Sequence, residues 1–316
     1  MLASPPARQA RPARHAVDGV LLLDKGLGLS SNQALQRVKW LLNAKKAGHT
    51  GTLDPAATGL LVLCFGEATK LAGIGLDEDK TYEGCVHLGV ATDTGDVEGQ
   101  VTARQVFTGS DRDIENALEG LRGEIEQIPP MYSALKREGK ALYEYARAGQ
   151  TVERQARRVL IRELVALRRE GDKCWIRVSC SKGTYIRVLA EQIGEALGCP
   201  AHLAALRRTR VGALEVGDAQ TVEALEARPM AGRLGCLLPS QILLKSMPLV
   251  ELDEAAERSV RQGQVLHRST GHAGAVQLHG PGGTLVGLAE ARADGTIHPK
   301  RILNIRLEEQ GSSPIQ

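Results

Sequence analysis

One carboxylate of this chain lies where covalent chemistry could take place. Asp54 belongs to the segment Gly48–Pro55, which has a second glycine at position 51 and a proline directly after the aspartate. Proline disfavours helical backbone in the preceding residue, so we expect Asp54 to be extended. A helical pattern ends before this segment and an apolar run follows it. The aspartate is therefore predicted on a short loop between buried elements, held rigidly but open to a ligand. The alternative is an ordinary turn in which the aspartate side chain only hydrogen-bonds the local backbone.

A carboxylate in a dry pocket needs a cationic partner, because desolvation disfavours its charged form. Arg187 is the best candidate. It lies in the first turn of a helix predicted from about Thr184 to Leu197, where the helix dipole makes a cation unfavourable. A nearby anion such as Asp54 would offset that penalty, whereas an arginine that points into solvent is the alternative.

The remaining pattern indicates an α+β domain with a mixed, mostly antiparallel central sheet. Ser110 is expected to cap a helix that Gly123 ends. Residues 159–167 and 174–180 read as paired strands across a turn at Gly171-Asp172. From about Pro248 onward a short Glu- and Ala-rich helix and small strands predict a compact β-rich module.

Composition is ordinary for a soluble globular chain: of 316 residues, 42% are hydrophobic and 24% charged. No apolar run reaches the length of a membrane span, so we expect no membrane association and a cytoplasmic location. Residues 1–17 are read as a disordered basic tail.

Six cysteines occur without metal-ligand spacing, so no metal is expected. Cys174 and Cys180 would lie about 20 Å apart on one strand, too far for a disulfide.

Positive charge is concentrated in two segments rather than in the whole chain, whose net charge is only +3. Residues 135–158 carry seven Lys or Arg against three Glu, and Arg207, Arg208 and Arg210 form a second cluster. Such segments neutralise phosphates in nucleic-acid complexes. A solvated surface face is an equally good interpretation from charge alone.

Six motifs in one order resemble the TruB family of bacterial tRNA pseudouridine-55 synthases. The resemblance runs from about Gly19 to Gly212, and the motifs are Gly19–Ser31, Gly48–Pro55, Lys80–Tyr82, Thr92–Asp96, Ile128–Lys136 and Ser181–Arg187. It implies a pseudouridine-synthase fold at residues 18–247, with an RNA-clamping insertion at about 128–158. It also implies a PUA-like RNA-binding domain at residues 248–310. One departure is Gly26, where the family usually has proline, and glycine should loosen that turn.

The resemblance also implies roles for individual residues. Asp54 matches the catalytic nucleophile, Arg187 its cationic partner, and Tyr82 the tyrosine that stacks on the target base and assists proton removal from its C5 atom. The substrate-binding set that it implies is His49, Tyr82, Tyr185, Leu206, Lys136 and Asp96. Lys80 and Lys182 are better explained as phosphate contacts or ion-pair partners than as catalysts.

The implied function is isomerisation of uridine 55 in the T-loop of tRNA, by base flipping and without metal or cofactor. The partner would be the T-arm of tRNA, with no guide RNA, and the chain would act as a monomer. Alternatives are a tRNA-folding chaperone in which catalysis is secondary, and a guide-RNA-dependent pseudouridine synthase. An aspartyl-phosphate hydrolase is disfavoured because no second acidic residue stands two places from Asp24 or Asp54.

Overall fold

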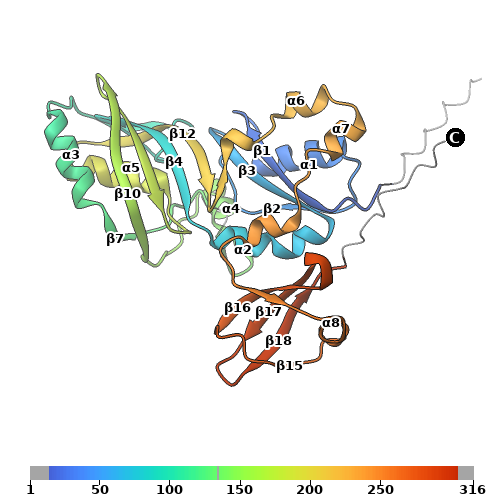
Figure 1. Cartoon of the computed structure of the whole chain (residues 1–316). Coiled ribbons are helices and arrows are strands. Elements are labelled where there is room, and N and C mark those ends of the chain that lie inside the picture. The colour runs from blue at the N-terminus through green and yellow to red at the C-terminus, as the bar shows by residue number, and fades with distance from the viewer. Residues whose placement is uncertain (1–13, 134, 305–316) are drawn as a thin grey trace, which may run out of the picture.

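The computed structural model describes residues 14–133 and 135–304, and its main body is built on one long mixed sheet (Figure 1). Most neighbouring strands of this sheet run antiparallel, as predicted. Its strands, in spatial order, are β1 (Gly19–Lys25), β3 (Ala57–Phe65), β12 (Ala201–Val211), β4 (Lys80–Leu88), β11 (Lys173–Cys180), β10 (Arg157–Glu170) and β7 (Gly123–Gln127).

Strand β12 joins the two halves of this sheet. It pairs in parallel with β3 from Leu206 opposite Ala57 to Arg208 opposite Gly59. On its other side it pairs antiparallel with β4 along nearly its whole length. Through this strand, the loop that precedes β3 is brought beside side chains of β4 and β12 that are far away in sequence.

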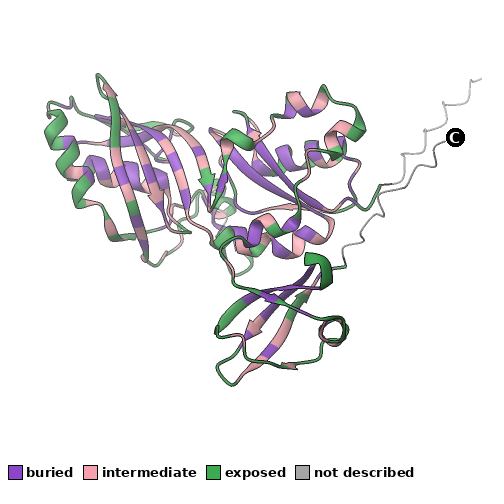
Figure 2. Cartoon of the chain, in the orientation of Figure 1, coloured by how far each residue is buried: buried purple, intermediate pink, exposed green. Residues whose placement is uncertain are grey.

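Three helices of ten or eleven residues cover this sheet, and polar caps set where two of them begin. Helix α1 (Ser31–Leu41) begins with a capping box between Ser30 and Gln33, and buries Ala34, Leu35, Val38 and Leu41. Helix α5 (Ile186–Ala196) packs on β12 and buries Ile186, Leu189, Ala190 and Ile193, the apolar face that its sequence spacing predicts. Figure 2 shows buried residues concentrated in these strands and along α5.

Helix α3 (Asp111–Gly120) begins with the predicted cap at Ser110 but ends earlier than expected. Gly123 does not end the helix. It has a φ of +88° and begins strand β7, where it pairs with Ile161 of β10. The prediction that Gly123 ends the helix is wrong, because this left-handed glycine marks the turn into a strand.

The β-rich module predicted after Pro248 is confirmed. A five-stranded sheet has the order β14 (Leu249–Glu251), β16 (Gly274–His279), β17 (Leu285–Ala291), β18 (Thr296–Ile302) and β15 (Leu266–His267). Helix α8 (Glu254–Arg261) packs beside β15 and β18. Leu285, Leu288 and Leu303 of this module share an apolar cluster with residues of β1 and β3, so the module is docked on the main body.

Shorter elements complete the chain. They are β2 (Ala47–His49), β5 (Val90–Thr92), β6 (Val101–Arg104), β8 (Lys136–Arg137), β9 (Lys140–Ala141), β13 (Leu214–Glu215), α2 (Ala72–Asp77), α4 (Leu142–Arg147), α6 (Val222–Glu226), α7 (Met230–Leu234) and the 3₁₀ turns η1 (Gly66–Leu71), η2 (Val216–Asp218), η3 (Ser240–Leu244) and η4 (Pro281–Gly283).

Most of the predicted N-terminal tail lies outside the described residues. Within the part that is described, the backbone of His15 pairs with Asn43 and Lys45, and Val17 is buried. Cys174 and Cys180 are buried free thiols, as expected from their separation.

The glycine that departs from the family pattern offers a stability test. Gly26 has no positive φ, has open space where a Cβ atom would lie, and follows an extended strand residue, all of which suit proline. We expect Gly26→Pro to raise the free energy of unfolding by about 0.4–1 kcal/mol, by restricting the unfolded chain. Thermal unfolding checks this. Gly28→Pro is the control: Gly28 has a φ of +81°, which proline cannot adopt, so this variant should be less stable than the wild type.

Candidate active site

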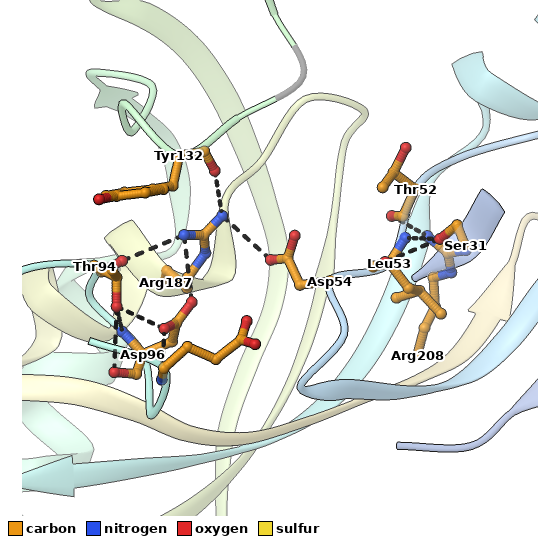
Figure 3. A network of polar contacts seen from close by, with 10 residues as sticks. Ser31, Thr52, Leu53, Asp54, Thr94, Asp96, Tyr132, Arg187 and Arg208 are labelled. Carbon is orange, nitrogen blue, oxygen red and sulfur yellow. Dashed lines mark hydrogen bonds and ion pairs between the residues drawn. The ribbon is translucent and has the colours of Figure 1, made fainter. Parts of the chain in front are cut away.

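The loop that carries Asp54 is fixed from both sides (Figure 3). The Ser31 hydroxyl, at the start of α1, donates to the Leu53 carbonyl at 2.9 Å and accepts the Leu53 N–H at 2.7 Å. On the other side Arg208 donates to the carbonyls of Gly51 and Thr52 at 3.1 and 3.3 Å. The backbone on the N-terminal side of Asp54 is therefore held while its carboxylate remains free to act.

Arg187 faces this carboxylate from the first turn of α5. Its guanidinium lies 3.2 Å from an Asp54 oxygen and 3.3 Å from an oxygen of Asp96. The same group donates to the backbone carbonyls of Thr94 and Tyr132. Only 7% of the arginine side chain is exposed. One buried cation therefore joins three separate segments: the Asp54 loop, the 92–96 turn and the 128–158 insertion.

Asp96 is fixed by its own turn. The Thr94 hydroxyl donates to one carboxylate oxygen at 2.6 Å, and the Glu98 N–H donates to the same oxygen at 3.0 Å. The other oxygen faces Arg187. Asp96 is buried, and it holds Arg187 through the guanidinium nitrogen that does not face Asp54 (Figure 3).

A small pocket opens beside Asp54. Its walls include Asp54, Arg187, Asp96 and, from β12, Leu206. Asp54 keeps 43% of its side chain exposed, so one edge of the carboxylate faces outward. Desolvation raises the pKa of Asp54, Arg187 and Lys25 oppose that shift, and the negative charge of Asp96 adds to it. The ionised carboxylate is therefore less stable than one in water, which favours its reaction with an electrophile.

Tyr82 and His49 lie close to the loop on the β4 and β2 sides. Tyr82 is buried and pairs across the strands with Arg208, and burial raises the pKa of its phenol. The imidazole of His49 accepts the Gly51 N–H at 3.4 Å. Burial and then the Arg208 charge lower the pKa of His49. Both side chains are accordingly neutral at pH 7.

Two other predicted residues are not among those that line the Asp54 pocket. The Tyr185 backbone exchanges hydrogen bonds with the Gln127 side chain, and its ring lies under the Arg157 guanidinium at 4.9 Å. Lys136 is exposed on the short hairpin of β8 and β9 within the insertion.

The two lysines with open interpretations have structural contacts. Lys182 forms a surface ion pair with Asp77 at 2.8 Å. Lys80 is buried and donates to the carbonyls of Gly75, Leu76 and Glu78 at the end of α2, while burial lowers its pKa to about 8. Lys80 therefore caps a helix rather than meeting a phosphate or a carboxylate.

The cluster Arg207, Arg208 and Arg210 is largely structural. Arg207 forms a two-point pair with Asp24, and Arg210 lies 3.5 Å from Glu215. Arg208 is only 2% exposed and was missed as a site residue, because in sequence it looks like its exposed neighbours. Two more supports were missed, Ser31 and the buried Lys25, which donates to Gly26 and Leu29 carbonyls. A lysine ending an apolar strand was the only signal for the latter.

Loss of the Arg208 contacts should loosen the loop. We expect Arg208→Met to lower the free energy of unfolding by about 2–4 kcal/mol, because the buried carbonyls of Gly51 and Leu60, and that of Thr52, lose their donor. Denaturant unfolding measures the change. Arg210→Met is the matched control on the same strand, since its half-exposed pair contributes about 0–1 kcal/mol; equal losses in both variants would contradict a special role for Arg208.

Neither a membrane-spanning helix nor a metal-binding cluster occurs in the residues that the structure describes. No helix there is long and apolar enough to cross a membrane. No group of three or more His, Cys, Asp and Glu side chains in residues 14–133 and 135–304 is arranged to hold a metal ion.

The fold is that of the pseudouridine synthases, as solved structures show. The chain superposes on a chain of a Cbf5-Nop10-Gar1 complex with a TM-score of 0.72 and 25% identity, covering 91% of this chain and 85% of the other. A chain of an H/ACA RNP bound to a substrate RNA containing 2′-deoxyuridine matches with a TM-score of 0.70 at 23% identity, with 96% and 94% covered. This second likeness concerns the fold alone.

Sequence comparisons narrow the class to one family. Residues 39–186 match the TruB family pseudouridylate synthase N-terminal domain, residues 187–236 the tRNA pseudouridylate synthase B C-terminal domain, and residues 248–303 the C-terminal domain of pseudouridine synthase II TruB. The tRNA pseudouridine synthase B of Aromatoleum aromaticum is 54% identical, covering 94% of this chain and 96% of its own length. That of Thiobacillus denitrificans is 52% identical, with 93% and 98% covered. The chain belongs to the TruB family and is a tRNA pseudouridine synthase, an isomerase.

Proposed function

We propose that this enzyme isomerises uridine 55 in the T-loop of tRNA, with Asp54 as the nucleophile and without metal or cofactor. The observation that carries the proposal is the half-exposed carboxylate of Asp54, held against the buried Arg187 at the wall of a small pocket. A uridine stacked inside the T-loop cannot reach such a pocket, so the proposal includes flipping of the base.

The reaction conserves every atom of the nucleotide. The bond between N1 of the base and C1′ of the ribose breaks, the base turns, and a bond forms between C5 and C1′. C5 then loses a proton and N1 gains one. Asp54 can take part by attacking C1′ and leaving again, or by adding to C6 and being expelled. Either route needs an ionised Asp54, and Arg187 favours that state.

The surrounding side chains receive distinct parts in this proposal. Leu206 supplies an apolar wall for the base, and Asp96 keeps Arg187 oriented. Tyr82 stacks on the base; because burial keeps its phenol protonated at pH 7, it would have to lose that proton before accepting one from C5. His49 and Tyr185 are assigned to nucleotides next to the target.

Recognition of the T-arm is assigned to this chain alone, as a monomer and without guide RNA. The support is the insertion at about 128–158, which has four more basic than acidic residues in its segment 135–158. Its Tyr132 carbonyl touches Arg187, so the insertion reaches the active site itself. Exposed Lys136 lies on the same insertion and is assigned to the RNA backbone.

The test is tritium release from a tRNA transcript labelled at C5 of its uridines, using purified enzyme with a chelator and no guide RNA. The expected result is release of about one equivalent per tRNA, as one proton leaves C5 per turnover. A transcript with cytidine at position 55 should release none. Release that persists with cytidine 55 would refute the position, and absence of release from both transcripts would favour a chaperone or guide-dependent role.

A further inference from the structure

Helix α1 presents an unusual side chain to solvent at its C-terminal end. Trp40 is 75% exposed, although tryptophan is usually well buried and this chain has only two. Its backbone carbonyl accepts the Asn43 N–H at the end of the helix, so the backbone that carries the side chain is fixed. An exposed indole on a backbone of fixed position is a ready surface for stacking.

The surroundings of Trp40 are basic and free of acidic residues in sequence. From Gly26 to Leu53 the chain has no Asp or Glu, but it has Arg37, Lys39, Lys45 and Lys46. Of these four, Arg37 is paired with Glu226. Across residues 14–133 and 135–304, no carboxylate lies within ion-pairing distance of the three lysines. Lys46 lies near enough to Glu67 to help lower the pKa of that carboxyl, while the charges of Lys39 and Lys45 are available to a partner.

A further cation joins this group from the N-terminal segment. Exposed Arg14 directly precedes His15, whose backbone pairs with Asn43 and Lys45. We name the set Arg14, Lys39, Trp40, Lys45 and Lys46 the Trp40 surface. It unites one exposed aromatic ring with four cations from two chain segments.

Both elements of the Trp40 surface lead to the active-site loop. Helix α1 runs from Ser31, which binds Leu53, to Trp40 about 14 Å farther along its axis. Strand β2 leads from Lys46 to His49 over about 10 Å. The surface is therefore near the pocket but too far away to touch the flipped uridine.

We infer that the Trp40 surface is an additional RNA-binding surface, on which Trp40 stacks against a base of the substrate tRNA outside the target nucleotide, while the flanking lysines contact phosphates. Aromatic rings beside unpaired cations are the combination that binds nucleic-acid strands. A protein partner would need an acidic surface to match these charges. The inference rests on the proposed tRNA substrate, but it concerns binding rather than turnover.

Binding of full-length tRNA transcript by two variants of the full chain tests the inference. Trp40→Ala should weaken binding at least about fivefold without changing the salt dependence, because stacking is worth about 1–3 kcal/mol per base and is not ionic. The double variant Lys45→Ala/Lys46→Ala should lower the slope of log Kd against log salt by about 0.7–0.9 per lysine. At saturating tRNA, kcat should stay unchanged in both.

Two control substitutions lie in other parts of the fold, just after β6 and at the start of β11. Val106→Ala removes an apolar side chain at least as exposed as Trp40, and Lys173→Ala removes an exposed lysine at the β10–β11 turn; neither should alter tRNA binding. In a Trp175→Phe background, Trp40 is the single tryptophan, so its fluorescence should be quenched saturably by tRNA.

Two results would overturn the inference. Wild-type affinity in Trp40→Ala with unquenched fluorescence would show that no base stacks there. If Trp40→Ala instead changed the molar mass of the protein in light scattering relative to wild type, with tRNA binding unaltered, the surface would be a contact between copies of the chain. Failure of the proposed function would look different, since tritium release would be absent from the wild type while these binding differences remained.

Discussion

Replacing Asp54 by asparagine should lower kcat for pseudouridine formation by about 10⁴-fold or more, while tRNA affinity stays within about threefold of wild type. Asparagine keeps the shape of the side chain and its place beside Arg187, but it cannot act as an anionic nucleophile. Arg187 retains Asp96 as a partner, so no buried cation is left unpaired by the change.

The same variant should show no loss of stability. The pKa of Asp54 is raised in the folded chain, so its ionised form is disfavoured relative to the unfolded chain. In the window between the unfolded value of about 3.9 and the raised folded pKa, the folded state binds more protons, and wild-type stability falls as pH rises. At pH 7 Asp54→Asn should thus be as stable as the wild type or more stable, and this advantage should shrink below about pH 4.

Tritium release, tRNA binding and denaturant unfolding at pH 4–7 measure these three expectations. Asp172→Asn, an exposed aspartate at the β10–β11 turn, is the control and should change none of them. A variant that loses tRNA binding together with activity would argue that Asp54 serves to position RNA rather than to attack it.

Replacing Arg187 by lysine should lower kcat by about 10²–10³-fold and destabilise the fold, although the charge is conserved. A guanidinium reaches Asp54, Asp96 and two carbonyls at once. An ammonium is a single point charge on a flexible stem and cannot span them. The free energy of unfolding should fall by about 1–3 kcal/mol, because buried Asp96 keeps an imperfect partner.

The pH dependence of kcat/KM should also change in Arg187→Lys. Arg187 lowers the pKa of Asp54, so a poorer partner should move the acid limb of kcat/KM to higher pH. Arg177→Lys is a close control: this arginine of β11 also lies between two carboxylates, Glu83 and Glu163, but 43% of it is exposed. Its change should cost less than about 0.5 kcal/mol. Similar losses in both variants would show that burial at Arg187 is unimportant.

The sequence was sufficient for the parts of the fold that local patterns govern. The Ser110 cap, the strand pair across Gly171-Asp172 and the buried face of α5 follow from spacing over a few residues. The candidate site was located through Asp54 and Arg187, whose residue types and loop or helix positions are legible one segment at a time.

The rest depended on pairings between distant segments. Nothing near Arg208 in sequence says that β12 will lie parallel to β3, yet that register buries the side chain beneath the Gly51–Thr52 backbone. Lys80 is a local exception, since its ammonium turns back onto carbonyls of Gly75, Leu76 and Glu78 at the end of α2. Gly123 misled because a left-handed glycine follows helices and precedes strands alike.

The position of β12 as the strand between β3 and β4 has a consequence for biosynthesis. During translation the strongly apolar β3 is complete at residue 65, but its partner on that side ends at residue 211. At a translation rate of about 5–20 residues per second, this edge of β3 stays unpaired for on the order of ten seconds until β12 has been synthesised. The nascent chain thus carries two unjoined half-sheets with unpaired edges, and the active-site loop acquires its Arg208 contacts only when ribosomal synthesis has passed about two thirds of the protein.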